Sequence, residues 1–142
     1  SGKSYLDVFH ASPAERIAMI KGGVSARWAK DVLHHLDLQA LAAEILKLSP
    51  STLRRKARSD ASLPIAVGER AVGLAKLIGQ VQAMAEESGA AEGFDAAKVL
   101  GDWLRSPLPA FGGICPIAYL DTFEGRALVS TVIEQSQSGT YA

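Results

Sequence analysis

Residues 112–142 read GGICPIAYLDTFEGRALVSTVIEQSQSGTYA, and they predict a tight turn followed by two helical segments. Gly112 and Gly113 allow backbone conformations that other residues disfavour, so the chain can turn sharply there. Pro116 suits the first position of a short helical segment. Asp121 or Thr122 can cap a second, longer helix. This end of the sequence therefore predicts helices arranged around a turn.

The final predicted helix has an apolar side and a polar side. Its apolar residues recur at helical spacing, and they are Leu128 and Val132, with Val129 and Ile133 on the flank. Its polar residues are Glu124, Arg126, Glu134 and Gln135. We expect the helix to end at Gly139. A surface of this kind is typical of a segment that binds another protein.

Upstream of this stretch, Trp103, Leu104 and Pro107 extend the pattern. The order W-L-x-x-P, G-G-x-x-P-I-x-x-L-D-T-x-E-G, V-x-x-x-I and G-x-Y-A closely resembles the toxin-binding domain of the Xre/MbcA/ParS antitoxins. The resemblance covers the last third of the chain and is specific in order and spacing. It implies that the partner is a RES-domain toxin, an enzyme that in this family attacks NAD or uses it for ADP-ribosylation.

Residues 39–58, QALAAEILKLSPSTLRRKAR, resemble a helix-turn-helix of the Xre type. Ala43 is expected where the two helices cross, and Leu46 and Leu48 are expected on either side of the turn. Ser49 can cap the second helix, with Pro50 at its first position and Leu53 facing the core. The residues predicted to contact DNA are Ser49, Ser51, Thr52, Arg54, Arg55 and Arg58, whose side chains can donate hydrogen bonds to bases and phosphates.

One position departs from the helix-turn-helix pattern, because Lys47 occupies the turn position that usually holds glycine. A left-handed backbone at a lysine is strained, so the turn either carries that strain or has another shape. An alternative interpretation is that the segment consists of ordinary short helices with a solvated basic face, because such patterns also occur by chance and as scaffolds.

Composition favours a folded helical protein: of 142 residues, 48% are hydrophobic and 21% charged. No apolar run is long enough to span a membrane and no signal-like segment opens the sequence, so we expect a cytoplasmic protein. The formal net charge is zero, yet residues 38–62 hold five basic and two acidic residues, a net of +3. Residues 89–142 hold three basic and six acidic residues, a net of −3. The basic segment favours nucleic acid, and the acidic one favours a partner with a basic pocket.

Two helices are predicted before the helix-turn-helix. Ser12 and Glu15 have the spacing of a capping box, and the helix that they begin should extend to Lys21 with Ile17 and Ile20 in the core. Ser25 can cap the next helix. That helix carries an apolar stripe made of Trp28, Val32, Leu33 and Leu36. His34 and His35 lie near its end, and no acid or nucleophile is tied to them by spacing, so a catalytic role is not expected.

A long helix is predicted over residues 64–87. Its apolar residues alternate at spacings of four and three, and they are Val67, Ala71, Leu74, Ile78, Val81 and Ala85. This row is either a dimer surface or buried within one chain. Residues 88–93 are small and flexible, and they separate a DNA-binding and dimerisation domain, 1–88, from a toxin-binding domain, 89–142. In the second domain Asp95 can cap a helix whose inward residues are predicted to be Phe94, Val99, Trp103 and Leu104.

The expected fold is all-α, with an N-terminal Xre-like helix-turn-helix bundle followed by a small helical toxin-binding domain. No catalytic pairing, metal cluster or cofactor fingerprint is recognisable, and the lone Cys115 forms no site, so a binding protein is favoured over an enzyme. The resemblance implies an antitoxin that neutralises a RES-domain toxin and binds its operator, and we expect it to form a homodimer. The alternative is a stand-alone transcriptional regulator with a dimerising or ligand-sensing C-terminal domain.

We expect the end of the chain to block the active site of the toxin. An NAD pocket holds a pyrophosphate, so it should offer arginines or backbone amides to a carboxylate, and an aromatic side chain could add a stacked contact. The residues predicted to bind the toxin are Glu134, Gln135, Ser138, Gly139, Thr140, Tyr141 and Ala142. The alternative is that the tail folds back or is disordered, as chain ends commonly are.

Overall fold

The computed structural model describes residues 4–137, and within that range every named element is a helix. The α-helices are α1 (Tyr5–His10), α2 (Pro13–Lys21), α3 (Ala26–Leu36), α4 (Ala42–Ile45), α5 (Pro50–Arg58), α6 (Ile65–Glu87), α7 (Ala96–Leu104) and α8 (Phe123–Gln137). Three short 3-10 segments join them: η1 (Gln39–Leu41), η2 (Pro109–Phe111) and η3 (Pro116–Tyr119). The all-α prediction is confirmed.

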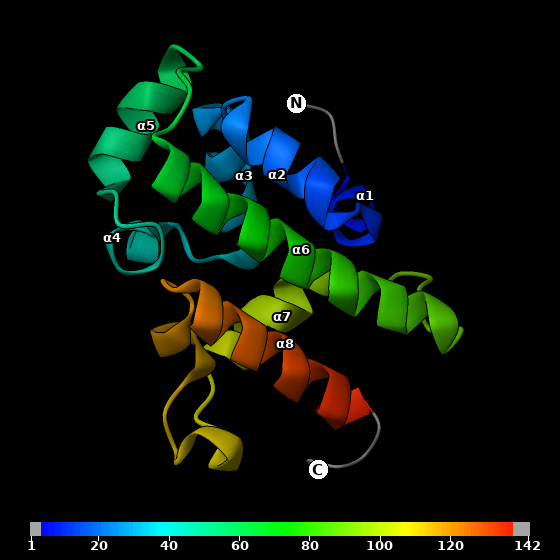
Figure 1. Cartoon of the computed structure of the whole chain (residues 1–142). Helices are drawn as coiled ribbons and strands as arrows, with labels where there is room; N and C mark the ends of the chain where they lie inside the picture. The colour runs from blue at the N-terminus through cyan, green and yellow to red at the C-terminus, as the bar shows by residue number, and fades with distance from the viewer. Residues whose placement is uncertain (1–3, 138–142) are drawn as a thin grey trace.

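Helix α6 is the central element on which most of the other α-helices pack. Helices α1, α2 and α3 contact it from one side, and α7 and α8 contact it from the other (Figure 1). The predicted apolar row is buried in the single chain at Val67, Ala71, Leu74, Ile78 and Ala85 and is half-buried at Val81. Of the two interpretations of this row, burial within the monomer is therefore the right one.

Glycines let α6 approach its neighbours closely. A Cβ at Gly79 would lie 2.0 Å from the carbonyl oxygen of Tyr5, and one at Gly68 would lie 2.8 Å from a methyl group of Val24. No side chain fits in such gaps, so α1 and the segment before α3 can rest directly on the backbone of α6.

The predicted helix caps are present. Ser12 and Glu15 form a reciprocal capping box, and the hydroxyl of Ser25 accepts from the backbone amide of Trp28 at 3.1 Å. Asp95 accepts from the amide of Lys98 at 3.1 Å. Thr122, one of the two candidates for the last helix, accepts from the amide of Gly125 at 2.9 Å. These local signals place the starts of four helices correctly because a cap depends only on residues within one turn.

Two predicted core residues lie at the surface instead. Ile17 is 52% exposed and Val99 is 46% exposed. Helix α2 packs only its Met19 and Ile20 edge against the core. In α7 a Cβ at Gly101 would lie 2.1 Å from the carbonyl oxygen of Leu36, so this face of α7 must turn toward α3, and Val99 turns away.

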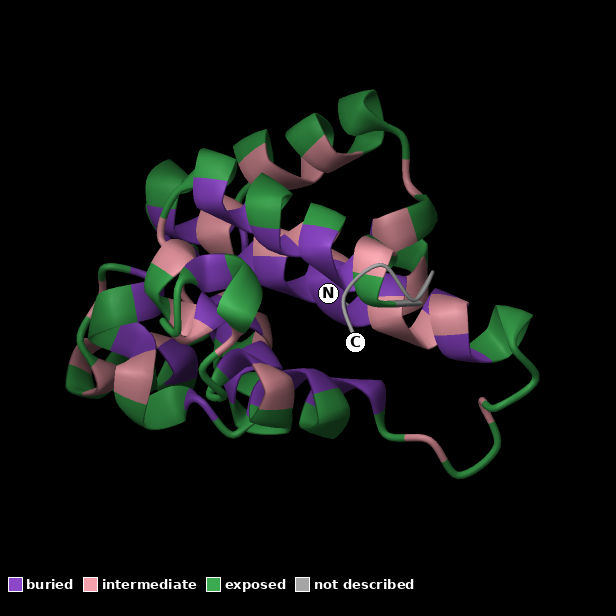
Figure 2. Cartoon of the chain, turned by 90° about the horizontal axis from the view of Figure 1, so that it is seen from below, coloured by how far each residue is buried: buried purple, intermediate pink, exposed green. Residues whose placement is uncertain are grey.

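A single hydrophobic cluster runs through the described part of the chain, from Val8 in α1 to Ile133 in α8. Figure 2 shows buried residues on the inner sides of the helices and exposed residues on the outer turns. Residues 88–93 lie at the surface between α6 and α7, and Gly89 and Gly93 both have positive φ angles. The proposed boundary between residues 88 and 89 therefore lies in a surface loop between two helices. The hydrophobic core continues across it. No helix among residues 4–137 is both long and apolar enough to cross a membrane.

Candidate functional site

Helix α5 carries a row of basic side chains on its outer face. Ser51, Arg54, Arg55 and Arg58 are exposed and follow the spacing i, i+3, i+4, i+7, which places them on one side of a helix. The opposite side is fixed, because Leu53 and Ala57 are buried. Among residues 4–137 no ion pair involves the three arginines. Figure 1 shows α5 at one end of the molecule.

Hydroxyl groups gather at the start of α5. The Ser49 hydroxyl accepts from the Thr52 amide at 3.2 Å and donates to the Thr52 hydroxyl at 2.9 Å, while the Ser51 hydroxyl lies 3.3 Å away. Thr52 is half-buried and the two serines are exposed. Ser49 therefore has a structural task as the cap, whereas the Ser51 side chain is the more available for an outside partner.

Hydrogen bonds join the end of α5 and the residues after it to the start of α3. The Ser25 hydroxyl donates to a carboxylate oxygen of Asp60, and this hydrogen bond is the main cause that lowers the pKa of Asp60. The Arg27 guanidinium donates to the carbonyl oxygen of Arg58 at 3.4 Å. Arg27 thus adds an exposed cation beside the arginine face. Sequence reasoning missed it because Arg27 lies on another helix.

The first helix of the helix-turn-helix is the short α4, and its small buried residue is Ala42. Ala43, predicted at the crossing, is exposed, so that prediction is wrong. The segment begins with the 3-10 turn η1, which has about three residues per turn where an α-helix has 3.6. This difference shifts the inward face by one residue.

The turn itself adopts the left-handed conformation, and Lys47 carries it with a φ of 62°. The other two non-glycine residues with positive φ among those described are Asp37 and Asp60, and aspartate tolerates this conformation better than lysine does. The lysine side chain extends to the C-terminal part of the chain, where its Nζ lies 3.2 Å from a carboxylate oxygen of Asp121.

Arg70 of α6 joins the same two segments. Its Nε donates to the backbone carbonyl of Asp121 at 2.9 Å, and its Nη1 donates to the carbonyl of Leu46 at 3.3 Å. The carbonyl at the end of α4 and the carbonyl just before α8 therefore share one guanidinium. No local sequence pattern predicts this arrangement, because the partners come from three distant segments.

Helix α8 rests on α6 through polar groups as well as apolar ones. Arg126, predicted on the polar surface, is only 5% exposed, so that prediction is wrong. Its guanidinium lies 3.0 Å from a carboxylate oxygen of Glu69 and donates to the Leu120 carbonyl at 3.0 Å. Burial is the main cause that lowers its pKa, and Glu69 acts in the opposite direction. Further along the two helices, the Gln80 side-chain amide donates to the Ser130 backbone carbonyl at 3.0 Å. The Ser130 hydroxyl donates to the Gln80 side-chain oxygen at 2.8 Å.

The outer face of α8 combines apolar and acidic residues. Val129, Val132 and Ile133 are buried as predicted, but Leu128 is 45% exposed and does not belong to the core. Leu128 turns outward because Val129 and Arg126 occupy the side that faces α6. Glu134 is exposed and Gln135 is half-buried. The remaining predicted toxin-binding residues lie outside the described residues; they are Ser138, Gly139, Thr140, Tyr141 and Ala142.

A groove of about 520 Å³ runs between α2, α6 and α8. Its floor is apolar, and the largely exposed side chains of Ile17 and Phe123 line it from opposite helices. Lys76 also lines the groove; its pKa is lowered by burial and by Arg16, and it forms no ion pair with any described residue. The groove therefore combines an apolar floor with Lys76, whose ammonium has no acidic partner among residues 4–137.

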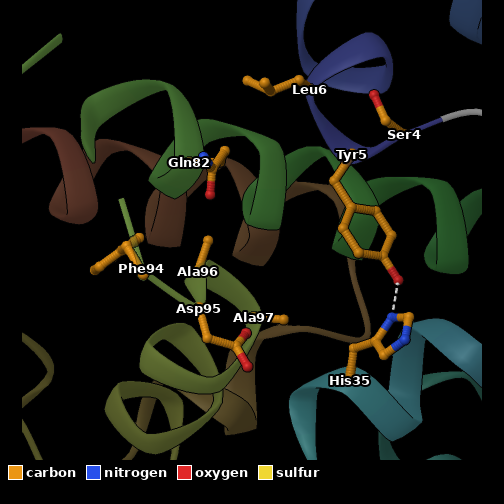
Figure 3. Close-up of a pocket in the computed structure, with 10 residues that line it drawn as sticks. Ser4, Tyr5, Leu6, His35, Gln82, Phe94, Asp95, Ala96 and Ala97 are labelled. Carbon is orange, nitrogen blue, oxygen red and sulfur yellow. Dashed lines mark hydrogen bonds between the residues drawn. The ribbon is translucent and has the colours of Figure 1, made fainter. Parts of the chain in front are cut away.

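A second cavity, of about 530 Å³, lies between α1, α3, α6 and α7 (Figure 3). Tyr5 points to His35 there, and the two side chains form a 2.5 Å hydrogen bond between the hydroxyl and Nδ1. Burial first, and then Asp31, raise the pKa of Tyr5 to about 12, so the phenol stays protonated. This pair ties α1 to α3. No metal-binding group of His, Cys, Asp and Glu occurs among residues 4–137.

Comparison with known proteins adds three findings. Residues 90–139 match the family described as the antitoxin Xre/MbcA/ParS C-terminal toxin-binding domain, and residues 15–76 match the antitoxin Xre-like helix-turn-helix domain. The chain is 45% identical over 141 residues to a protein of Sphingobium sp. (strain YBL2) named Prs ADP-ribosylating antitoxin, covering 98% of this chain and 88% of that protein. No solved structure matches the chain.

Proposed function

Because the chain belongs to the Xre/MbcA/ParS antitoxin family, we propose that it neutralises a RES-domain toxin by direct binding and represses its own operon by binding DNA. The match of residues 90–139 to a toxin-binding domain carries this proposal. The relative's name joins ADP-ribosylation, Prs and antitoxin. By extension, the toxin countered by this chain is an ADP-ribosylating enzyme whose target is Prs. The chain itself acts as a binding protein in the cytoplasm, without catalysis and without a cofactor.

The toxin is bound by the outer face of α8 and by the residues that follow it. Leu128 offers exposed apolar surface, and Glu134 offers a carboxylate near the end of the helix. An enzyme that binds NAD must hold a pyrophosphate, so its cleft favours an anionic group over a cationic one. The end of the chain, from Ser138 to Ala142, would enter that cleft and exclude NAD.

DNA is bound by α5. Three arginines that have no acidic partner among residues 4–137 lie with the Ser51 hydroxyl on one open face of a helix that is capped and fixed from behind. This combination fits a recognition helix, since guanidinium groups can contact both phosphates and base edges. Arg27 extends the same basic surface from α3.

The homodimer forms through the groove between α2, α6 and α8. Since the apolar row of α6 is already buried, a second copy needs another surface. The groove is self-complementary in charge: Lys76 lies in it, and Glu124, exposed beside Phe123, has no ion-pair partner within residues 4–137. A two-fold axis through the groove would place the Phe123 and Glu124 of each copy near the Ile17 and Lys76 of the other.

Co-expression tests the main proposal. The neighbouring reading frame that encodes a RES domain should arrest growth when expressed alone and should be tolerated when the chain is co-expressed. The two proteins should co-purify, and the purified toxin should lose its NAD-consuming or ADP-ribosylating activity as the chain is added. A chain that binds DNA but leaves the toxin active would support the alternative, a stand-alone regulator.

A further inference from the structure

The turn of the helix-turn-helix depends on a residue of the C-terminal domain. Lys47 holds the left-handed conformation that this turn requires, and a side chain in that conformation crowds its own backbone. An ion pair between the Lys47 ammonium and the Asp121 carboxylate, 3.2 Å apart, stabilises this conformation and offsets the strain. Glycine would need no partner at this position.

Arg70 makes the same connection through the backbone. Its two hydrogen bonds reach the carbonyl of Leu46, one residue before Lys47, and the carbonyl of Asp121. Leu46 is the C-cap of α4, the first helix of the motif, and is fully buried, so its carbonyl needs a donor within the protein. A shift of residues 120–122 would therefore alter the turn through two separate contacts.

The segment that holds Asp121 is itself fixed by the neighbouring arginine. Arg126 donates to the carbonyl of Leu120 and pairs with Glu69, which precedes Arg70 on α6. The position of Asp121 is thus set by the start of α8, the helix that carries the proposed toxin-binding surface.

From these contacts we propose that Asp121 and Arg70 are positioning residues for DNA binding, so that the toxin-binding domain sets the affinity of α5 for the operator. This inference rests on the DNA binding proposed above. The two residues need not touch DNA. They hold the turn that fixes the start of α5, and any partner that moves the start of α8 changes the affinity for DNA by the same linkage.

The direction in which one substitution changes the affinity for DNA separates this proposal from simple electrostatic attraction. Asp121→Asn removes a negative charge and frees the Lys47 ammonium, so a chain that only attracts DNA by charge should bind it more tightly. If Asp121 positions the turn, the same substitution should weaken operator binding instead. Because the ion pair is partly exposed, the expected loss is about two- to five-fold. Arg70→Gln, which breaks hydrogen bonds from a charged donor, should cost about ten-fold.

The experiment measures binding of the full chain and its variants to the DNA upstream of its own coding sequence and to a random duplex at the same salt concentration. Lys47→Gly in the Asp121→Asn background should restore operator binding to within about two-fold of the parent, because glycine adopts the turn without strain. Lys98→Ala, which removes an exposed pair with Asp102 on α7, is the matched control and should change nothing. Thermal unfolding of each variant confirms that it is folded.

The outcomes distinguish the two levels of the proposal. A parent chain that binds neither DNA at low salt overturns the DNA-binding function and this inference with it. A parent that binds its operator, with Asp121→Asn equal or tighter, overturns the positioning role alone. Failure of Lys47→Gly to rescue folded Asp121→Asn also overturns it, because a general loss of packing would not be repaired at the turn.

Discussion

The guanidinium of Arg126 lies 3.0 Å from the carboxylate of Glu69 and directly over Gly73, where a Cβ would come within 2.4 Å of Nε. This ion pair joins α8 to α6, and Gly73 provides the space for the buried guanidinium. A buried cation is stable only where it is paired and hydrogen-bonded, and Arg126 has both a carboxylate and the Leu120 carbonyl. One well-satisfied charge therefore contributes to the contact between the two proposed domains.

Replacing Arg126 should destabilise the whole chain. Arg126→Ala leaves a carbonyl and a carboxylate without their donor and opens a gap over Gly73, which should cost about 2–4 kcal/mol in the free energy of unfolding. The urea midpoint measures the loss. Arg105→Ala is the matched control, because Arg105 pairs with Asp102 and Asp37 at an exposed site, and its effect should stay below about 1 kcal/mol. Equal losses for the two variants would contradict the role of burial.

The arginine face of α5 should control DNA binding and nothing else. Arg54→Ala, Arg55→Ala and Arg58→Ala should each weaken operator binding, by about 1–3 kcal/mol where the side chain contacts a base. Electrophoretic shift or fluorescence anisotropy measures this loss. Stability and toxin neutralisation should be unchanged, since all three side chains are exposed and lie away from α8. Full operator affinity in the triple variant would remove α5 from the DNA interface.

Deleting residues 139–142 should leave a folded chain that binds DNA but loses much of its affinity for the toxin. The toxin should regain activity in the presence of the truncated chain, because the group that excludes NAD is gone. Activity titrations with the parent and truncated chains provide the measurement. Neutralisation by the truncated chain at parent stoichiometry would shift the inhibitory contact to Leu128 and the rest of the outer face of α8.

Light scattering should show a dimer of the isolated chain at tens of micromolar. Lys76→Glu and Glu124→Lys should each favour the monomer through like-charge repulsion across the groove, and the double variant should recover the dimer. Ile65→Glu is the control, because Ile65 is an exposed apolar residue that does not line the groove. A parent of strictly monomeric mass would argue against the homodimer, and a dimer indifferent to both charge changes would place the interface elsewhere.

Stability should fall as the pH rises from about 10 to 12. The pKa of Tyr5 is raised to about 12 in the folded chain, above its ordinary value of about 10, so the folded state holds the proton more tightly. This contribution is complete below pH 10 and is lost as the pH rises through 12. Comparing unfolding curves of the parent and Tyr5→Phe separates this effect from the ionisation of lysines in the same pH range. Parallel pH profiles would show that the raised pKa of Tyr5 does not contribute to the stability.

The sequence predicted what depends on neighbours within a turn or two. Ser12, Ser25, Ser49 and Asp95 cap their helices because capping is local, and the length of α6 follows from its apolar spacing. Helix rotation was harder to predict. Ile17, Val99 and Leu128 have apolar side chains, yet close backbone contacts and a buried arginine turn them to the solvent.

The candidate site divides in the same way. The outward positions of Arg54, Arg55 and Arg58 could be predicted, since they follow from the burial of Leu53 on a short amphipathic helix. The burial of Arg126 and the links from Arg70 to Leu46 and Asp121 could not. These contacts join segments far apart in the sequence, and one sequence carries no record of which distant residues meet.

The contact between Lys47 and Asp121 limits how such antitoxins can exchange parts. A chimera that takes its DNA-reading half from this chain and its other half from a relative inherits a lysine in the turn without a guarantee of its carboxylate. Recombination at residues 88–93 would preserve every helix and still disturb the turn. Positions 47, 70 and 121 should therefore be transferred together when a new toxin specificity is grafted onto this scaffold.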